Sequence, residues 1–157
     1  MTDIHASRGP RALYVTLAAL VGALALSLSA GASNATLRVT LDTWSRTIGA
    51  DAHSVSVAAK GRHPRRMTSS ALRFRHDALR ARAAIAAQHP SSANGQKARK
   101  LALAAFADYA SAGSRWAATG RARVQKQRAA ASRNAAAATI SARAGNRLLV
   151  AVARLLR

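Results

Sequence analysis

The sequence predicts an all-α protein, with an N-terminal apolar signal or anchor helix followed by a loosely packed, Ala/Arg-rich antiparallel helical bundle or extended hairpin. Alanine, the strongest helix former, makes up about a quarter of the 157 residues. Apolar side chains recur at steps of three and four residues, which is the period of a helix face. Large apolar residues are sparse and the net charge is +20, so the expected core is thin.

The first element is an apolar segment near the N-terminus. Two arginines precede an apolar run over residues 12–26, and small residues follow, with Ala30 and Ala32 at the spacing that a signal peptidase recognises. We therefore predict a signal peptide over residues 1–32, and cleavage after it leaves a basic helical domain of residues 33–157.

Two alternatives to cleavage stay open. The apolar run is shorter than the about 20 residues that span a bilayer, but residues 12–30 can serve as an uncleaved membrane anchor, or can form a helix buried in a soluble fold. The positive charges on the two sides of the segment are almost balanced, so its orientation is not fixed. The expected location is exported, either secreted or in the cell envelope, or membrane-anchored.

The first helix of the basic domain is expected over residues 35–59. Its apolar stripe consists of Leu37, Leu41, Trp44, Ile48 and Val55. Ser33 or Asn34 is the expected N-cap. The basic stretch 60–64 contains a glycine that suits a helix stop and a proline that disfavours helix before it, so a loop is expected there.

Three further helices are expected over residues 69–88, 94–118 and 121–157. The second helix has a predicted stripe of Leu72, Leu79 and Ile85, flanked by Ala71 and Ala78. The third has a stripe of Leu101, Ala105, Tyr109, Ala112 and Trp116, and two glycines weaken its end. The short loops predict antiparallel neighbours. The end of the fourth helix is expected to pack in the bundle, with binding in a membrane interface as the alternative.

Residues that carry catalysis are scarce in this chain. It has no cysteine, which excludes disulfides, thiol nucleophiles and Cys-based zinc sites. The basic domain has four carboxylates, Asp42, Asp51, Asp77 and Asp108, and neighbouring arginines are expected to keep them ionised. Asp77 follows Arg73 by four residues and precedes Arg80 by three, which predicts ion pairs within one helix. No motif of a hydrolase, a zinc site or a phosphate loop occurs. We predict no enzyme, no cofactor and no metal site.

Positive charge is the remaining functional signal, since Lys and Arg total 25 against 5 acidic residues. The candidate polyanion contacts are Arg62, Arg65, Arg66, Arg73, Arg80, Arg121, Arg123, Lys126 and Arg128. Such a field attracts polyanions of any sequence. Base recognition is not expected, because the aromatic residues mostly fall on the apolar stripes. A solvated charged face with no partner is the structural alternative.

These observations predict a non-catalytic binding or structural role for an exported or membrane-anchored basic helical protein. The expected partner is anionic lipid or an envelope polymer, held by charge. The alternative is an intracellular basic protein that binds nucleic acid non-specifically, and it requires that the basic domain lies in the cytoplasm.

Overall fold

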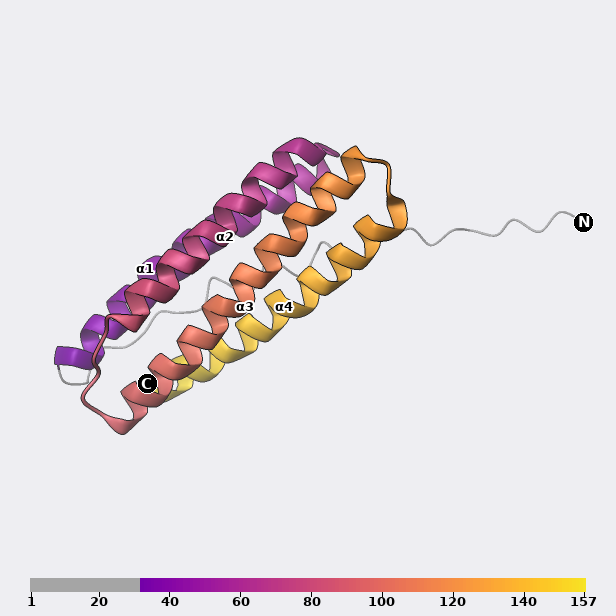
Figure 1. Ribbon diagram of the computed structural model, residues 1–157. Coiled ribbons are helices and arrows are strands. Elements are labelled where there is room, and N and C mark those ends of the chain that lie inside the picture. Colours follow the sequence, from indigo (N-terminus) through magenta and orange to yellow (C-terminus); the bar gives the residue numbers. More distant parts are fainter. Residues whose placement is uncertain (1–31) are drawn as a thin grey trace, which may run out of the picture.

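The computed structural model describes residues 32–157, which form four α-helices and no strand (Figure 1). The helices are α1 (Ala32–Lys60), α2 (Pro64–Ala86), α3 (Ala93–Val124) and α4 (Arg128–Leu155). The all-α prediction is confirmed over this range. The predicted signal or anchor segment, including Ala30 of the predicted cleavage site, lies outside the described residues, and Ala32 is the first residue of α1.

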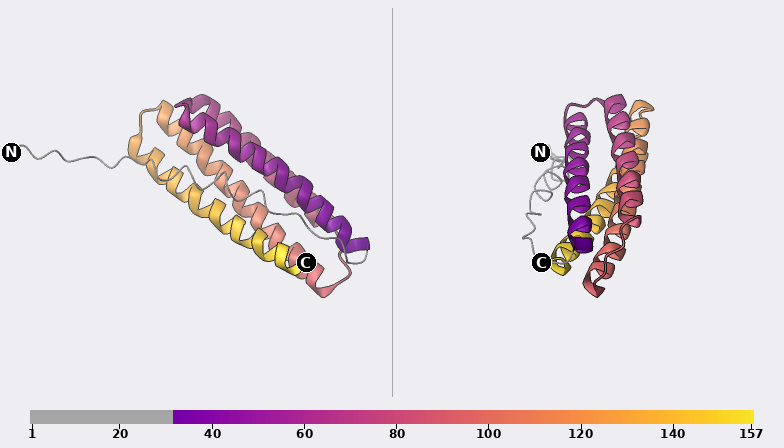
Figure 2. Two further views of the ribbon diagram at one scale, coloured as in Figure 1. Left: turned by 180° about the vertical axis from the view of Figure 1, so that it is seen from behind. Right: turned by 90° about the vertical axis from the view of Figure 1, so that its left-hand side faces the viewer.

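The helices run alternately up and down, and α3 is the central one (Figure 2). It packs along α2 on one side and along α4 on the other, whereas α1 packs mainly on α2. Between residues 32 and 157 no close backbone contact joins α1 to α4, and the Arg38 guanidinium reaches the C-terminal residue by donating to the carbonyl oxygen of Arg157 at 3.4 Å. The chain therefore forms two helical hairpins, α1–α2 and α3–α4, which meet through α2 and α3.

The apolar stripe of α1 is confirmed, whereas the stripe predicted for the second helix was wrong at two positions. Leu72 and Leu79 are 45% and 40% exposed. The buried apolar face of α2 instead consists of Met67, Ala71, Phe74, Ala78, Ala81 and Ile85, at steps of three and four residues. Alanine at three of these positions lets the α2 backbone come close to α3, so small residues occupy the contact and the leucines lie beside it.

Glycines mark the points where the helices approach most closely. A Cβ atom on Gly113 of α3 would lie 2.9 Å from a backbone nitrogen of α2, and one on Gly120 would lie 2.7 Å from a backbone carbonyl oxygen of α2. A Cβ on Gly145 of α4 would lie 2.9 Å from a carbonyl oxygen of α3. Only glycine fits at such distances. These contacts are tighter than the loose packing that the composition suggested.

The start of the second helix also differs from the prediction. Helix α2 begins at Pro64 and not at residue 69, because proline has no N–H to lose and its fixed φ suits the first turn of a helix. Arg65 and Arg66 therefore lie in the first turn of α2 and not in a loop.

The boundary between the last two helices is also shifted. Helix α3 continues through Gly113 and Gly120 to Val124, and both glycines lie against α2. The fourth helix begins at Arg128 and not at residue 121. Arg121 and Arg123 thus lie in the last turn of α3.

Asn34 is not the N-cap of the first helix, since α1 already begins at Ala32. Its buried side chain donates from Nδ2 to the Oγ of Ser92 at 2.7 Å. Ser92 is the N-cap of α3, and its Oγ accepts from the N–H of Gly95 at 2.9 Å. Asn34 therefore links the start of α1 to the start of α3.

The end of α4 packs in the bundle, as the first interpretation of this segment predicted. Leu149, Val152 and Leu156 are buried in the common core. A polar contact also joins α3 to α4, because the Tyr109 hydroxyl donates to Oδ1 of Asn146.

Replacing Gly113 with alanine tests the close approach of α2 and α3. On an open helix this change stabilises by about 0.8–1 kcal/mol through helix propensity. Here we expect it to lower the free energy of unfolding by about 1–3 kcal/mol, because the added Cβ meets backbone atoms of α2. The measurement is urea denaturation, with the exposed neighbour Ser114→Ala as the matched control, which should change stability by less than about 0.5 kcal/mol. A more stable Gly113→Ala variant would contradict the close contact.

Candidate polyanion-binding site

The two hairpin turns lie at the same end of the bundle and have the same hydrogen bonds (Figure 1). In each, one N–H donates to the carbonyl five residues back and the preceding N–H donates to the carbonyl three residues back. The donors are His63 and Arg62 in the first turn, at 3.0 and 3.4 Å, and Gln127 and Lys126 in the second, at 2.8 and 3.1 Å. This is the Schellman arrangement that ends many helices.

The left-handed residue of each turn is a cation. Arg62 has a φ of 55° and Lys126 a φ of 57°, in a backbone region where glycine is the usual residue. The predicted end of the first helix in the stretch 60–64 is confirmed, since α1 ends at Lys60 and Gly61 follows it, but within the described residues no glycine has a positive φ. Both turns thus place a long cationic side chain at a backbone position that glycine adopts without a Cβ clash.

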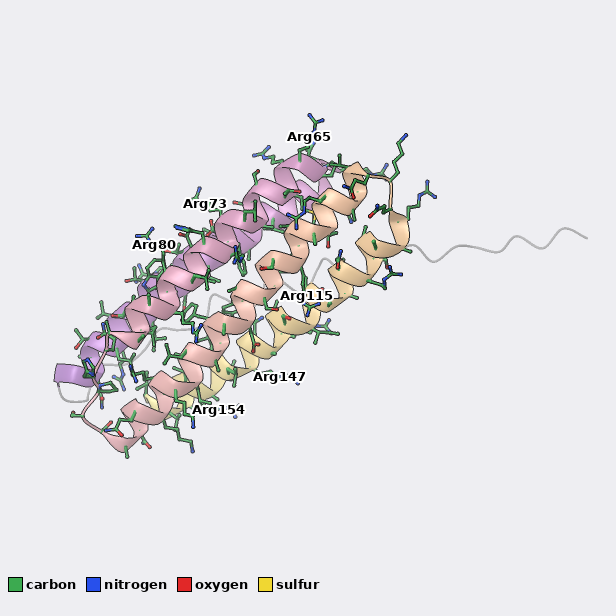
Figure 3. All side chains as sticks on the ribbon, in the orientation of Figure 1. Arg65, Arg73, Arg80, Arg115, Arg147 and Arg154 are labelled. Atoms are coloured by element: carbon green, nitrogen blue, oxygen red, sulfur yellow. The ribbon has the colours of Figure 1, made fainter. Side chains whose placement is uncertain are left out.

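The turns bring most of the predicted polyanion contacts together. We call this surface the basic end, and it consists of Lys60, Arg62, Arg65, Arg66, Arg121, Arg123, Lys126 and Arg128. Figure 3 shows Arg65 at this end. All are exposed except Arg123, which is half-buried. The nearest carboxylate along the chain, Asp51, lies nine residues before Lys60. Among residues 32–157, the basic end therefore carries positive charge without a carboxylate close to it along the chain.

Two helices begin at the basic end without a side-chain cap. Neither the His63 side chain before α2 nor the Gln127 side chain before α4 accepts a hydrogen bond from its helix, and no acidic residue occurs in either first turn. Cations occupy these turns instead, although the positive end of the helix dipole disfavours each one by about 0.3–1 kcal/mol at low ionic strength. An anion bound here would interact favourably with the positive ends of the two helix dipoles, and it would reduce the repulsion among the cations.

Two open hollows adjoin one another at the basic end. One has a volume of about 250 Å³ and the other about 630 Å³, and Arg65 and Val124 line both. Val124, with 46% of its surface exposed, and Pro64 supply apolar wall. Lys60, Pro64 and Val124 are not among the predicted polyanion contacts, because their proximity to the arginines depends on the two turns lying side by side.

Arg73 and Arg80 lie elsewhere, on the outer face of α2 (Figure 3). The predicted ion pairs with Asp77 are confirmed, at 3.8 Å from each guanidinium, and Arg73 Nε also lies 3.1 Å from Oδ1 of Asp51 on α1. The Arg80 guanidinium carbon lies 5.5 Å from the centre of the Trp44 ring. These two arginines join α1 to α2, and carboxylates offset part of their charge.

Asp51 and Asp77 form a buried carboxylate pair between α1 and α2. Their side chains are 5% and 11% exposed, and Asp51 Oδ2 is buried without a hydrogen-bond partner. Burial, together with the hydrogen bond and the charge of Asp77, raises the pKa of Asp51 to about 6, against the opposing effect of Arg73. The expectation that arginines lower the pKa of each aspartate is wrong for Asp51, because burial outweighs the neighbouring cation.

The carboxylate pair lacks the access to solvent that acid–base catalysis on a bound substrate requires. Both groups are almost fully covered, and neither hollow of the basic end includes them. Across residues 32–157 no three His or Asp side chains gather into a group that would hold a metal ion. None of the helices in this part of the chain is long and apolar enough to cross a membrane.

No family model, curated protein or solved structure matches this chain. Its functional interpretation therefore depends on the geometry and charge of its own residues.

Replacing Arg62 and Lys126 with glycine tests how much their left-handed backbone conformation destabilises the fold. We expect Arg62→Gly and Lys126→Gly each to raise the free energy of unfolding by about 0.5–1 kcal/mol, because glycine adopts a positive φ without a Cβ clash. Thermal or urea unfolding measures the effect. Arg65→Gly, at a helical position, is the control and should destabilise by a similar amount. Destabilisation by Arg62→Gly would show that the side chain stabilises the turn.

Stability should also depend on the protonation of Asp51. Because its folded pKa of about 6 lies above the usual 3.8, the folded chain binds more protons in this window, so the contribution of Asp51 to stability falls as pH rises from about 4 to 6. Asp51→Asn, which keeps a hydrogen-bond donor, should match the wild type near pH 4 and exceed its free energy of unfolding by about 2 kcal/mol at pH 7. Equal pH profiles for the two proteins would exclude a raised pKa at this site.

Proposed function

We propose that this protein binds polyanions through the basic end and has no catalytic role. One observation carries the proposal: two turns with the same backbone geometry bring eight cations to one end of the bundle, around two hollows. Among the described residues no aspartate lies within eight positions of these cations along the chain. Packing of the helices holds these cations together against their repulsion, so a multivalent anion is the ligand that gains most from the arrangement.

The chemistry of the basic end suits phosphate or another anionic group and not a nucleobase. Guanidinium groups bind such anions through two parallel hydrogen bonds. Stacking of bases needs exposed aromatic rings, but Phe74, Phe106, Tyr109 and Trp116 are buried, and the half-buried Trp44 contacts Arg80. Binding by charge alone is expected to be independent of sequence and sensitive to salt.

The place where α1 begins suits an envelope polymer as the partner. Residue Ala32 lies at the end of α1 opposite the basic end (Figure 1), and a helix of 29 residues spans about 43 Å. We propose that residues 1–32 export the chain, or that residues 12–30 anchor it, and that the basic end then binds an anionic polymer at a distance from the anchoring membrane. The second candidate is an intracellular protein that binds nucleic acid non-specifically, which the same exposed cations support.

The location of the chain separates the two candidates. The experiment measures the mass and the N-terminal residue of the protein recovered from the cytosol, the membrane and the outside of its host. The export proposal expects a chain that begins at or near Ser33 outside the membrane, or an intact chain in the membrane whose basic domain is accessible to protease from outside. An intact soluble chain in the cytosol would contradict export and favour nucleic acid.

Salt dependence tests whether charge drives the binding. If about four cations contact phosphates, the affinity for DNA or for a vesicle containing anionic lipid should fall by about 100-fold between 50 and 200 mM salt. The variant Arg66→Gln/Arg128→Gln should reduce the slope of log affinity against log salt by about two units, since both side chains belong to the basic end.

The matched control removes two exposed cations from α4, far from its first turn. Arg143→Gln/Arg154→Gln carries the same net charge as the test variant and should leave the slope almost unchanged. Affinity that does not depend on salt would exclude the electrostatic account, and an equal loss in both variants would exclude the basic end as its place.

A further inference from the structure

Helix α2 has two pairs of arginines with the same spacing, and one of these pairs has its partners on α1. Arg73 faces α1, where Oδ1 of Asp51 lies 3.1 Å from its Nε. Arg80, seven residues later, has the centre of the Trp44 ring 5.5 Å from its guanidinium carbon. Trp44 and Asp51 are also seven residues apart. Helix α1 therefore docks on α2 by matching an aromatic ring and a carboxylate to two arginines two turns apart.

The second pair, Arg75 and Arg82, lies on the side of α2 that borders α3. A Cβ atom on Gly113 of α3 would lie 2.8 Å from the Cβ of Arg75. The carbonyl oxygen of Ala86, four residues after Arg82, accepts a hydrogen bond from the Arg99 guanidinium of α3. Both arginines of this pair are exposed, and no ion pair among residues 32–157 involves either of them.

Two leucines lie beside these unpaired arginines and are open to solvent. Leu72 and Leu79 are 45% and 40% exposed. They alternate with the two arginines at steps of three and four residues, so the four side chains share one face of α2. On α3, an apolar row precedes Gly113 at similar steps. We call the resulting surface the α2–α3 seam, and it consists of Leu72, Arg75, Leu79, Arg82, Leu103, Ala107 and Ala110.

We propose that the α2–α3 seam binds an acidic amphipathic helix of another protein, whose apolar side chains pack on Leu72 and Leu79. Carboxylates of that helix pair with Arg75 and Arg82. The two leucines lie about 10 Å apart along the helix axis, which equals the distance between positions two turns apart on a partner helix. The contact of α1 with α2 uses the same combination of apolar packing and paired arginines within this chain.

A second copy of this chain does not supply such a helix. Asp51 and Asp77 are buried, and Asp42 pairs with Arg46 on its own helix. Among residues 32–157, Asp108 is then the one carboxylate left, whereas the seam has two unpaired arginines. Repulsion between chains of net charge +20 also opposes self-association. The complementary partner is therefore a different and acidic protein.

The test is a binding titration of the full chain, kept soluble in a non-ionic detergent, with labelled helical peptides at about 200 mM salt, which screens distant charges. The acidic peptide has about 21 residues, with leucines along one stripe and glutamates at seven-residue spacing beside them. A scrambled peptide of the same composition distributes the leucines around the helix. A third peptide has lysines in place of the glutamates.

The variants of the seam have matched controls at exposed positions elsewhere in the bundle. Leu72→Gln/Leu79→Gln is compared with Val57→Gln/Ile140→Gln, which changes two exposed apolar residues on α1 and α4. The charge reversal Arg75→Glu/Arg82→Glu is compared with Arg143→Glu/Arg154→Glu, which has the same net charge.

The proposal expects the acidic peptide to bind at least about 10-fold more tightly than the scrambled one. The leucine variant should lower its affinity by about 10-fold or more, because binding buries the two side chains, and the apolar control by less than about 2-fold. The charge reversal at the seam should weaken the acidic peptide by about 10-fold or more and strengthen the lysine peptide, since paired charges set the preference. The charge control should not strengthen the lysine peptide as much.

Three results would overturn this inference. The scrambled peptide binds as tightly as the acidic one, the leucine variant keeps full affinity, or no saturable binding occurs up to about 1 mM peptide. Vesicles of phosphatidylglycerol that displace the peptide and lose affinity in the leucine variant would make a lipid surface the occupant, and this would also contradict the proposal. The basic end is tested separately, because Arg66→Gln/Arg128→Gln should change the affinity for the acidic peptide by less than about 2-fold at this salt concentration.

Discussion

The close approach of α3 to both its neighbours is the constraint on which the rest of this structure depends. The chain has few large apolar side chains, so its helices are held together by contact between small residues along α3 and by a short series of aromatic rings. Gly113 and Gly120 place the α3 backbone against α2, and Gly145 places α4 against α3. Phe74 of α2 lies edge-on to Tyr109 and Trp116 of α3, with ring centroids 6.0 and 5.3 Å apart. The dispersion energy of such contacts depends on short distances between atoms, so small residues in close contact can stabilise the bundle without large side chains.

This packing determines where the charge lies. Helices α2 and α3 pack side by side and run antiparallel. The turn before α2 and the turn after α3 therefore lie at the same end of the bundle, and their cations lie there too. Opposite-charge contacts serve a different purpose on the outer face of α2, where Arg73 and Arg80 join Asp51, Asp77 and Trp44 across the α1–α2 contact. The aspartates are thus used within the fold, and the basic end is left without them. The packing of the helices thus also separates the unpaired cations at the turns from the paired arginines on α2.

The sequence predicted the helices and the cations but not their arrangement. Helical periodicity located the core of α1, because Leu37, Leu41, Ile48 and Val55 leave one face without ambiguity. It misplaced the centre of the α2 face, because weight on leucine put Ala71 and Ala78 at the side of the predicted stripe, whereas both alanines are buried. Pro64 indicates a helix boundary, and it begins α2 because proline suits the first position of a helix. The pairing of Asp51 with Arg73 was within reach of sequence reasoning, since the two residues lie eleven positions before and after Arg62, but only once the turn was placed there. The hollows depend on two turns 64 positions apart lying side by side, which no local pattern encodes.

The most direct test of the account is to map which backbone amides respond when a polyanion binds. Titration of an isotope-labelled chain with a short phosphodiester oligomer, followed by NMR, reports this residue by residue. The account predicts that shifts concentrate in residues 60–68 and 121–130, including the unbonded N–H groups at the starts of α2 and α4, and that the middles of the helices stay unchanged. Shifts of equal size along the arginines of α2 and α4, with no maximum at the two turns, would contradict the claim that the fold gathers its cations into a binding site.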